Sequence, residues 1–118
     1  MDLIDLSKRA ASAKLNARSK TLARIDGRDL GLSRFSEHPR WEIHPGGDEL
    51  LQLLEGELEL TLLLGGEIQR LVMRPQTVFV VPRGIWHSPI PRGPVAILHL
   101  ADYRGTKVSN AEDPRQEV

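Results

Sequence analysis

Cysteine is absent from the sequence, and aromatic side chains are scarce. Without cysteine the chain has no disulfide, no thiolate metal site and no cysteine nucleophile, and this composition is compatible with a reducing cytosol. Tyrosine occurs once, and phenylalanine and tryptophan occur twice each. A binding site built on aromatic stacking is therefore not expected. A small apolar or oxygenated ligand fits better than a nucleotide or a large sugar.

The sequence also lacks an excess of charge of either sign and a long apolar run. Lysine and arginine total 16, aspartate and glutamate total 16, and the formal net charge is zero. Balanced charge gives no electrostatic reason to expect binding to nucleic acid or to an anionic membrane. No apolar segment approaches the length of a bilayer span, and the N-terminus has no signal-peptide pattern. We therefore expect a cytoplasmic protein without nucleic-acid or membrane partners.

The length of 118 residues fits one domain with a single hydrophobic core. Residues 1–20 are expected to form an N-terminal arm, because the stretch DLSKRAASAKLNAR is rich in alanine, lysine and arginine. Asp5 or Ser7 could cap a short helix there. The domain itself is expected over residues 21–104, followed by a C-terminal tail over residues 105–118.

From Thr21 onward, short apolar segments alternate with turns that contain glycine or proline. In one of these segments the leucines at 58, 60 and 62 alternate with Glu57, Glu59 and Thr61, as in a strand with one buried face. Leucine-rich segments are also compatible with helix, but the regular spacing of the turns favours strands. The pattern predicts an all-β fold of about nine antiparallel strands, a sandwich or barrel such as the jelly roll.

Two segments carry side chains that could bind a metal ion. In the first, Trp41 to Gly56, period-2 alternation puts Glu42 and His44 on one face of a strand, and the turn that follows brings Glu49 back towards His44. The second segment, Val80 to His87, delivers His87 just after a Pro-x-Gly turn. Two imidazoles and one or two carboxylates at the ends of short strands are typical of a metal site.

The spacing of these residues resembles the two motifs of the cupin family. The first motif has glycine, five residues, His-x-His, three or four residues, Glu, six residues and Gly. The second has glycine, five residues, Pro-x-Gly, two residues, His, three residues and Asn. Six positions of this chain agree with the two motifs in both residue type and spacing: His44, Glu49, Gly56, Pro82, Gly84 and His87.

Four positions depart from the two motifs. Ser36 and Gln76 stand where each motif opens with glycine, and Pro91 stands where the second motif closes with asparagine. Glu42 stands in place of the first histidine. The first three changes concern turns, whereas the change at Glu42 concerns the chemistry of the site.

The resemblance implies a jelly-roll barrel and one divalent metal ion held by Glu42, His44, Glu49 and His87. Glu42 could instead pair with an arginine such as Arg34, which would leave a face of two histidines and one carboxylate. That face suits non-haem iron and also Lewis-acid chemistry. Iron, manganese, zinc and nickel all accept these donors, so the residues do not name the ion.

The resemblance also implies a small-molecule ligand inside the barrel. The pocket is expected to be mainly aliphatic, lined by Leu51, Leu53 and Ile85. His99, in an apolar last strand, is either a core histidine or part of the pocket wall. His38, beside Pro39 in a loop, is expected to be solvated, and Trp41 and Trp86 are expected in packing or subunit contacts.

Three classes of function stay open at this stage. The first is a metal-dependent enzyme with dioxygenase-, isomerase- or lyase-like chemistry on a small organic substrate. The second is a metal- or ligand-binding protein without catalysis, and the third is a metal-free cupin. We also expect a homodimer, because exposed sheet edges favour pairing between copies.

Overall fold

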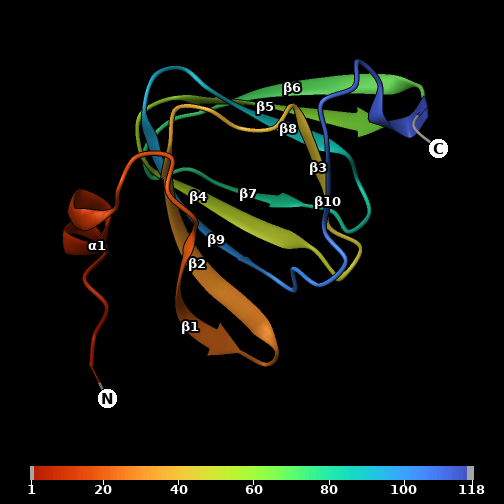
Figure 1. Ribbon diagram of the computed structural model, residues 1–118. Coiled ribbons are helices and arrows are strands. Elements are labelled where there is room, and N and C mark those ends of the chain that lie inside the picture. The colour runs from red at the N-terminus through yellow and green to blue at the C-terminus, as the bar shows by residue number, and fades with distance from the viewer. Residues whose placement is uncertain (1, 117–118) are drawn as a thin grey trace.

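The computed structural model describes residues 2–116 and shows two antiparallel sheets that face each other (Figure 1). Each sheet has five strands. In order across the first sheet, the strands are β1 (Lys20–Ile25), β2 (Arg28–Phe35), β9 (Val95–Ala101), β4 (Glu49–Glu55) and β7 (Val78–Val81). In order across the second, they are β10 (Lys107–Ser109), β3 (Trp41–Ile43), β8 (His87–Pro91), β5 (Leu58–Leu64) and β6 (Glu67–Met73). The all-β jelly roll predicted from the turn spacing is confirmed.

The hydrophobic core fills the space between the two sheets. The leucines of strand β5 face inward as predicted, because Leu58, Leu60 and Leu62 are fully buried whereas Glu59 is half-buried. Thr61, expected on the exposed face, is buried as well, at 6% exposure. Leu53 of β4 meets them from the opposite sheet within the same core cluster. Removing each of these leucines from water contributes about 1.5–3 kcal/mol to folding. Three residues of this core, Phe35, Leu51 and Ile97, also line a cavity between the sheets, so the core and the cavity share a border.

The N-terminal arm contains the short helix α1 (Leu6–Ser12), which lies against β2 (Figure 1). The side chain of Asp5 caps it by accepting a hydrogen bond of 3.2 Å from the backbone N–H of Lys8, as predicted. Ala10 is buried in a small cluster with Leu32 and Ala96, and Ala13 of the same apolar stripe packs against that cluster. Within residues 2–116, no helix has both the length and the apolar character needed to cross a bilayer.

Part of the stretch expected as a C-terminal tail belongs to a sheet. Strand β10 pairs with β3, with Val108 opposite Glu42. A short 3-10 helix, η1 (Pro114–Gln116), follows it. The indole Nε1 of the buried Trp41 donates a hydrogen bond of 3.1 Å to the carbonyl of Ala111, so Trp41 fixes this segment to the domain.

Candidate metal centre

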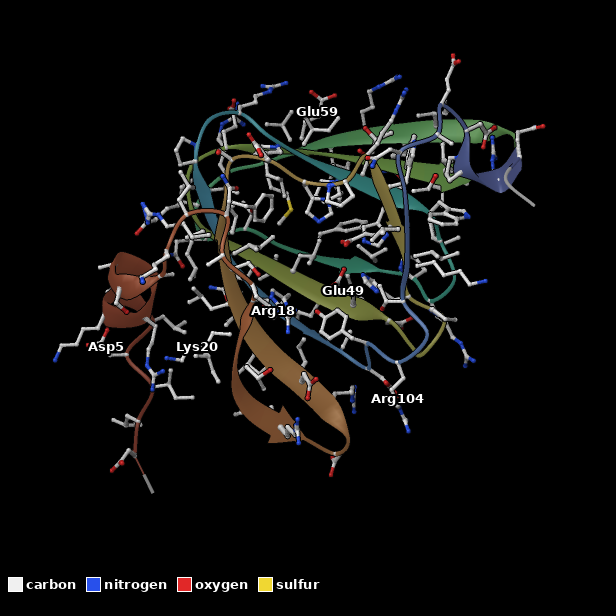
Figure 2. All side chains as sticks on the ribbon, in the orientation of Figure 1. Asp5, Arg18, Lys20, Glu49, Glu59 and Arg104 are labelled. Atoms are coloured by element: carbon white, nitrogen blue, oxygen red, sulfur yellow. The ribbon has the colours of Figure 1, made fainter. Side chains whose placement is uncertain are left out.

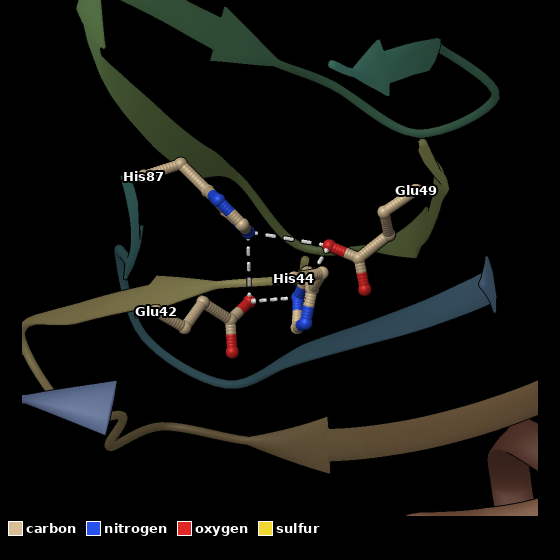
Figure 3. A group of neighbouring side chains, drawn as sticks. All are labelled: Glu42, His44, Glu49 and His87. Carbon is tan, nitrogen blue, oxygen red and sulfur yellow. Dashed lines mark hydrogen bonds and ion pairs between the residues drawn. The ribbon is translucent and has the colours of Figure 1, made fainter. Parts of the chain in front are cut away.

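Three strands from both sheets bring the four candidate ligands together (Figure 3). Glu42 of β3 lies directly opposite His87, the first residue of β8. His44 follows the end of β3, and Glu49 begins β4 in the other sheet. His44, Glu49 and His87 therefore lie at strand ends, where turns help to set their positions, whereas Glu42 is the middle residue of the three-residue strand β3.

Two hydrogen bonds from backbone N–H groups join the turns that carry these residues. The N–H of Gly84 donates a hydrogen bond of 3.1 Å to the carbonyl of His44. The N–H of Arg83 donates one of 2.8 Å to the carboxylate of Asp48, next to Glu49. Gly84 has φ +71°, a left-handed conformation that glycine adopts without strain, so the Pro-x-Gly turn is needed to deliver His87. These contacts fix the two motif segments relative to each other.

The four side chains converge on one point. One ligand atom from each residue lies within 4.8 Å of the others. Nε2 of His87 is 3.0 Å from Oε1 of Glu42 and 3.2 Å from Oε1 of Glu49. Nε2 of His44 is 3.1 Å from the same Glu49 oxygen and 3.6 Å from the Glu42 oxygen. His87, His44 and Glu49 are only 0%, 4% and 4% exposed.

The hydrogen bonds of His87 fit a cation at this point. Its Nδ1 lies 3.0 Å from the backbone carbonyl of Ile85, which only accepts, so Nδ1 carries a proton. In the neutral ring, Nε2 then directs a lone pair at two carboxylate oxygens. That arrangement is repulsive unless a proton or a metal ion lies between them.

His44 gives a second indication of the same kind. Its Nδ1 is 2.8 Å from the hydroxyl of Thr106, which orients the ring. Its buried Nε2 has no hydrogen-bond partner among residues 2–116, because the nearby Glu49 oxygen lies outside the alignment of a hydrogen bond. Buried polar atoms are rarely left unpaired, and a metal ion would satisfy this one. The donor set and its geometry therefore fit a divalent cation.

The same contacts shift the protonation of all four groups. Burial disfavours the charged imidazoles, but the carboxylates of Glu42 and Glu49 outweigh it, raising the pKa of His44 to about 9 and that of His87 to about 10. Burial also disfavours charge on Glu49, yet the two histidines lower its pKa to about 2. The pKa of Glu42 likewise lies well below its usual value, because contacts with His38, His44 and His87 outweigh its burial. Without a metal ion, the cluster is thus two imidazolium groups facing two carboxylates.

His38 lies at the site, and the expectation that it is solvated is wrong. Its side chain is only 19% exposed, and Nε2 is 3.3 Å from Oε2 of Glu42, the oxygen that faces away from His87. Its ring also packs 5.3 Å from that of Phe35. The loop position of His38 gave no strand parity from which this contact could have been predicted.

Arg34, the alternative partner considered for Glu42, lies elsewhere. Its guanidinium pairs with Glu55 at 3.0 Å and contacts the carbonyl of Ala10 in the arm. Glu42 therefore pairs with the surrounding histidines instead of with Arg34.

Two further residues hold candidate ligands by hydrogen bonds, and the sequence gave no signal for either. Tyr103 donates a hydrogen bond of 2.7 Å from its hydroxyl to Oε2 of Glu49, and Thr106 contacts His44. Both come from the loop after β9, which has no motif and no periodic pattern. Contacts of this kind orient metal ligands and raise metal affinity.

A cavity of about 730 Å³ opens beside the cluster. Of the predicted pocket residues, Leu51 and His99 line it, whereas Leu53 and Ile85 lie in or against the hydrophobic core. The wall is more polar than expected, because β1, β2 and the loops around them contribute hydroxyl and amide groups. The polar lining includes Asn16, Ser19, Thr21, Ser33, Tyr103, Thr106 and Asn110.

Comparison with known families settles the relationship that the motifs suggested. The model of the cupin domain family matches residues 35–101, more than half of the chain and including all four clustered residues. The chain belongs to the cupin family. A search of curated proteins gives no match.

Solved structures share this cupin fold. A cupin-2 domain protein from Shewanella frigidimarina has 17% identity and a TM-score of 0.71, over 83% of this chain and 92% of that one. A protein from Neisseria meningitidis has 19% identity and a TM-score of 0.73, over 85% and 98% of the two chains. Hydroquinone 1,2-dioxygenase from a Sphingomonas species has 16% identity and a TM-score of 0.66, over 86% and 80%. At these identities the likeness concerns the fold.

Proposed function

We propose that this cupin binds one divalent metal ion through Glu42, His44, Glu49 and His87 and acts as an enzyme on a small organic molecule in the adjoining cavity. One observation carries the metal site. Nε2 of His87 faces two carboxylate oxygens at 3.0 and 3.2 Å while its Nδ1 is committed to a backbone carbonyl. The other three residues complete a buried set of two imidazoles and two carboxylates, which would neutralise a dication.

The donor set suits iron, manganese, zinc or nickel. An ion with an open position would supply Lewis-acid polarisation or, in the case of iron, reaction with O₂. The protein's own part is to orient the donors and to shape the cavity. Thr106 holds the His44 ring and Tyr103 holds the Glu49 carboxylate. Phe35, Leu51 and Ile97 give the cavity an apolar side against which the body of a ligand could pack.

Oxygenation, isomerisation and lyase chemistry are the reaction classes that this arrangement supports. The similar Sphingomonas protein is a hydroquinone 1,2-dioxygenase, crystallised with 4-hydroxybenzoate. That likeness adds support for an oxygenase acting on a small oxygenated compound. A cupin that binds its ligand without turning it over stays the alternative among metal-binding functions.

A metal-free cupin is the second candidate, and the opposite pKa shifts in the cluster favour it. Two imidazolium groups and two carboxylates neutralise each other without an ion. Elemental analysis of protein purified without chelators and without a metal-affinity column separates the two candidates. We expect about one divalent ion per chain. A protein that stays free of metal after incubation with each of the four ions is the metal-free cupin.

A matched pair of variants localises the metal. Glu49→Gln keeps the size of a buried ligand and removes its charge, so metal content should fall steeply. Glu59→Gln makes the same change on the outer face of β5, where Glu59 points away from the cavity and pairs with Arg92 (Figure 2). The metal content of the Glu59→Gln variant should be unchanged. Equal loss in both variants, or in neither, would place the metal elsewhere.

Two further expectations stay predictions. The first is a homodimer, supported by the exposed apolar residues Val78 and Val80 on the edge strand β7. Light scattering coupled to gel filtration measures this mass directly. The second is a cytoplasmic location, which cell fractionation would test.

A further inference from the structure

A network of side-chain hydrogen bonds runs from Glu49 to the wall of the cavity. The hydroxyl of Tyr103 donates to Oε2 of Glu49 at 2.7 Å and lies 2.8 Å from Nδ1 of His99. Nε2 of His99 lies in turn 2.8 Å from the hydroxyl of Ser19 and 3.0 Å from that of Ser33. These hydrogen bonds thus link a candidate metal ligand to four residues that line the cavity, Tyr103, His99, Ser19 and Ser33.

The donor and the acceptor of each hydrogen bond in this network can be assigned. Tyr103 has one hydroxyl proton and gives it to the carboxylate of Glu49, so its oxygen accepts from Nδ1–H of His99. Burial lowers the pKa of His99, which keeps the ring neutral. Nε2 of His99 therefore carries a lone pair directed at the serine hydroxyls.

Two hydroxyl groups compete for that single lone pair. Ser33 lies in β2, which pairs with β9, the strand that carries His99. Ser19 precedes β1, is exposed, and has the carbonyl of Leu32 at 3.5 Å as a second acceptor. Ser19 is the one of the two that a ligand hydroxyl could replace at little cost.

Gly31 leaves the space that the His99 ring occupies. A Cβ at position 31 would lie 2.4 Å from Cε1 of His99 and 3.0 Å from the hydroxyl of Ser19. The ring packs directly over the backbone of β2, so a side chain there would push His99 or Ser19 away. The absence of a side chain at position 31 thus gives the His99 ring room to lie over β2.

The rest of the cavity wall has few groups that would bind an anion. In the part of the chain that the structure describes, no lysine or arginine lines it. Its carboxylates outside the metal cluster are Glu37 and Asp29, and Asp29 pairs with Arg24. Its remaining polar groups are hydroxyls, amides and histidines, which suit an uncharged partner.

We propose that the cavity binds an uncharged, hydroxyl-bearing molecule, and that Nε2 of His99 accepts a hydrogen bond from a hydroxyl group of this ligand, replacing Ser19. Tyr103 connects this contact to Glu49. The inference deepens the proposed function, on which it rests only for placing the ligand beside a metal ion.

The protonation of His99 can be tested without any ligand. Long-range ¹H–¹⁵N NMR of histidine-labelled protein, metal-free and zinc-loaded, distinguishes the two neutral tautomers from imidazolium. We expect His99 to be neutral with its proton on Nδ1 in both forms. A proton on Nε2, or an imidazolium at neutral pH, would overturn the proposal.

Ligand binding tests the chemical class. The probes are resorcinol, which has two uncharged hydroxyls and is stable to air, phenol, which lacks one of them, and 3-hydroxybenzoate, which replaces one by a carboxylate. Calorimetry on zinc-loaded protein should show resorcinol binding about tenfold more tightly than either analogue, the value of one well-made hydrogen bond. Equal binding of the three probes, a preference for 3-hydroxybenzoate, or no binding of resorcinol at millimolar concentration would overturn the proposal.

Three variants locate the contact. His99→Phe and Gly31→Ala should each remove the preference for resorcinol over phenol, and His99→Gln, which keeps an acceptor, should restore part of it. Gly66→Ala is the matched control, because a Cβ there meets no other atom within 4 Å. A preference that survives His99→Phe and Gly31→Ala refutes the role of His99.

Metal content, measured on each protein, keeps this test separate from that of the metal site. If no protein takes up an ion, the proposed function fails, while the NMR and the probe series on metal-free protein still decide the role of His99. If the metal binds and the probes are not discriminated, only the present inference fails.

Discussion

Tyr103 holds the carboxylate of Glu49 by a single hydrogen bond of 2.7 Å to Oε2, while Oε1 of the same group faces His44 and His87. The two oxygens of Glu49 thus have different surroundings: one contacts a phenol and the other faces the point where a metal ion would lie. Figure 2 shows Glu49 directed into the space between the sheets.

Replacing Tyr103 by phenylalanine should weaken metal binding while the fold is kept. The ring would still pack against His44 and His99, whose centroids lie 5.1 and 5.4 Å away, but Glu49 would lose the donor that orients it. Loss of a contact of this kind lowers metal affinity about 10- to 100-fold. Competition with a chromophoric chelator measures the affinity. Unchanged affinity in the variant would mean that strand β4 alone orients Glu49.

The metal-free protein should be most stable in mildly acid solution. The folded-state pKa values of His44 and His87, about 9 and 10, lie above the ordinary 6.5, so their stabilisation is complete below pH 6.5 and is lost as the pH rises through about 9 to 10. The pKa of Glu49 is about 2 instead of 4.5, so its stabilisation is present above pH 4.5 and is lost as the pH falls through about 2. Thermal unfolding in the presence of a chelator should show the highest Tm between pH 4.5 and 6.5. A Tm that rises from pH 6.5 to 9 would contradict these assignments.

Metal binding near neutral pH should release protons. An ion can take the Nε2 atoms of His44 and His87 only after the imidazolium protons leave, and both pKa values lie above 7. We therefore expect metal affinity to increase with pH between 6 and 8. Titration calorimetry in two buffers with different ionisation enthalpies gives the number of protons released. Identical heats in both buffers would show that the histidines are already neutral before the ion binds.

The hydrophobic core and the outer sheet face should respond differently to truncation. Leu60→Ala empties a fully buried position and should cost about 2–5 kcal/mol in free energy of unfolding. Ile90→Ala, on the neighbouring strand β8, removes a side chain that is 45% exposed and should cost less than half as much. Urea denaturation measures both. Similar losses would mean that the face carrying Ile90 is covered in solution, as in a dimer.

The cluster of four residues could be predicted from the sequence because its members lie in short strands or directly beside the turns that join them. There, period-2 alternation and a turn of fixed length determine the face on which a side chain emerges. Glu42 and His44 share a face for that reason, and Pro-x-Gly delivers His87 by the same kind of local rule. The structure brings these residues together with Glu49, as the spacing indicated.

The residues around the cluster could not be predicted in this way. Tyr103 and Thr106 come from a loop that folds back after the last strand of the first sheet, so only the tertiary structure brings them to Glu49 and His44. Period-2 alternation also has a limit within strand β4. Leu51 and Leu53 both belong to the hydrophobic core, but only Leu51 also borders the cavity, and the inward parity that they share does not distinguish the two positions.

The pairing of β10 with β3 ties the end of the chain to Glu42. Strand β3 has only three residues and gains neighbours on both sides because Lys107–Ser109 lies along its outer edge. A chain cut after Arg104 would remove that edge, the hydroxyl that steadies His44 and the acceptor of the Trp41 indole together. A proteolytic nick in this stretch would therefore disable one wall of the barrel while leaving every residue of the two sequence motifs in place.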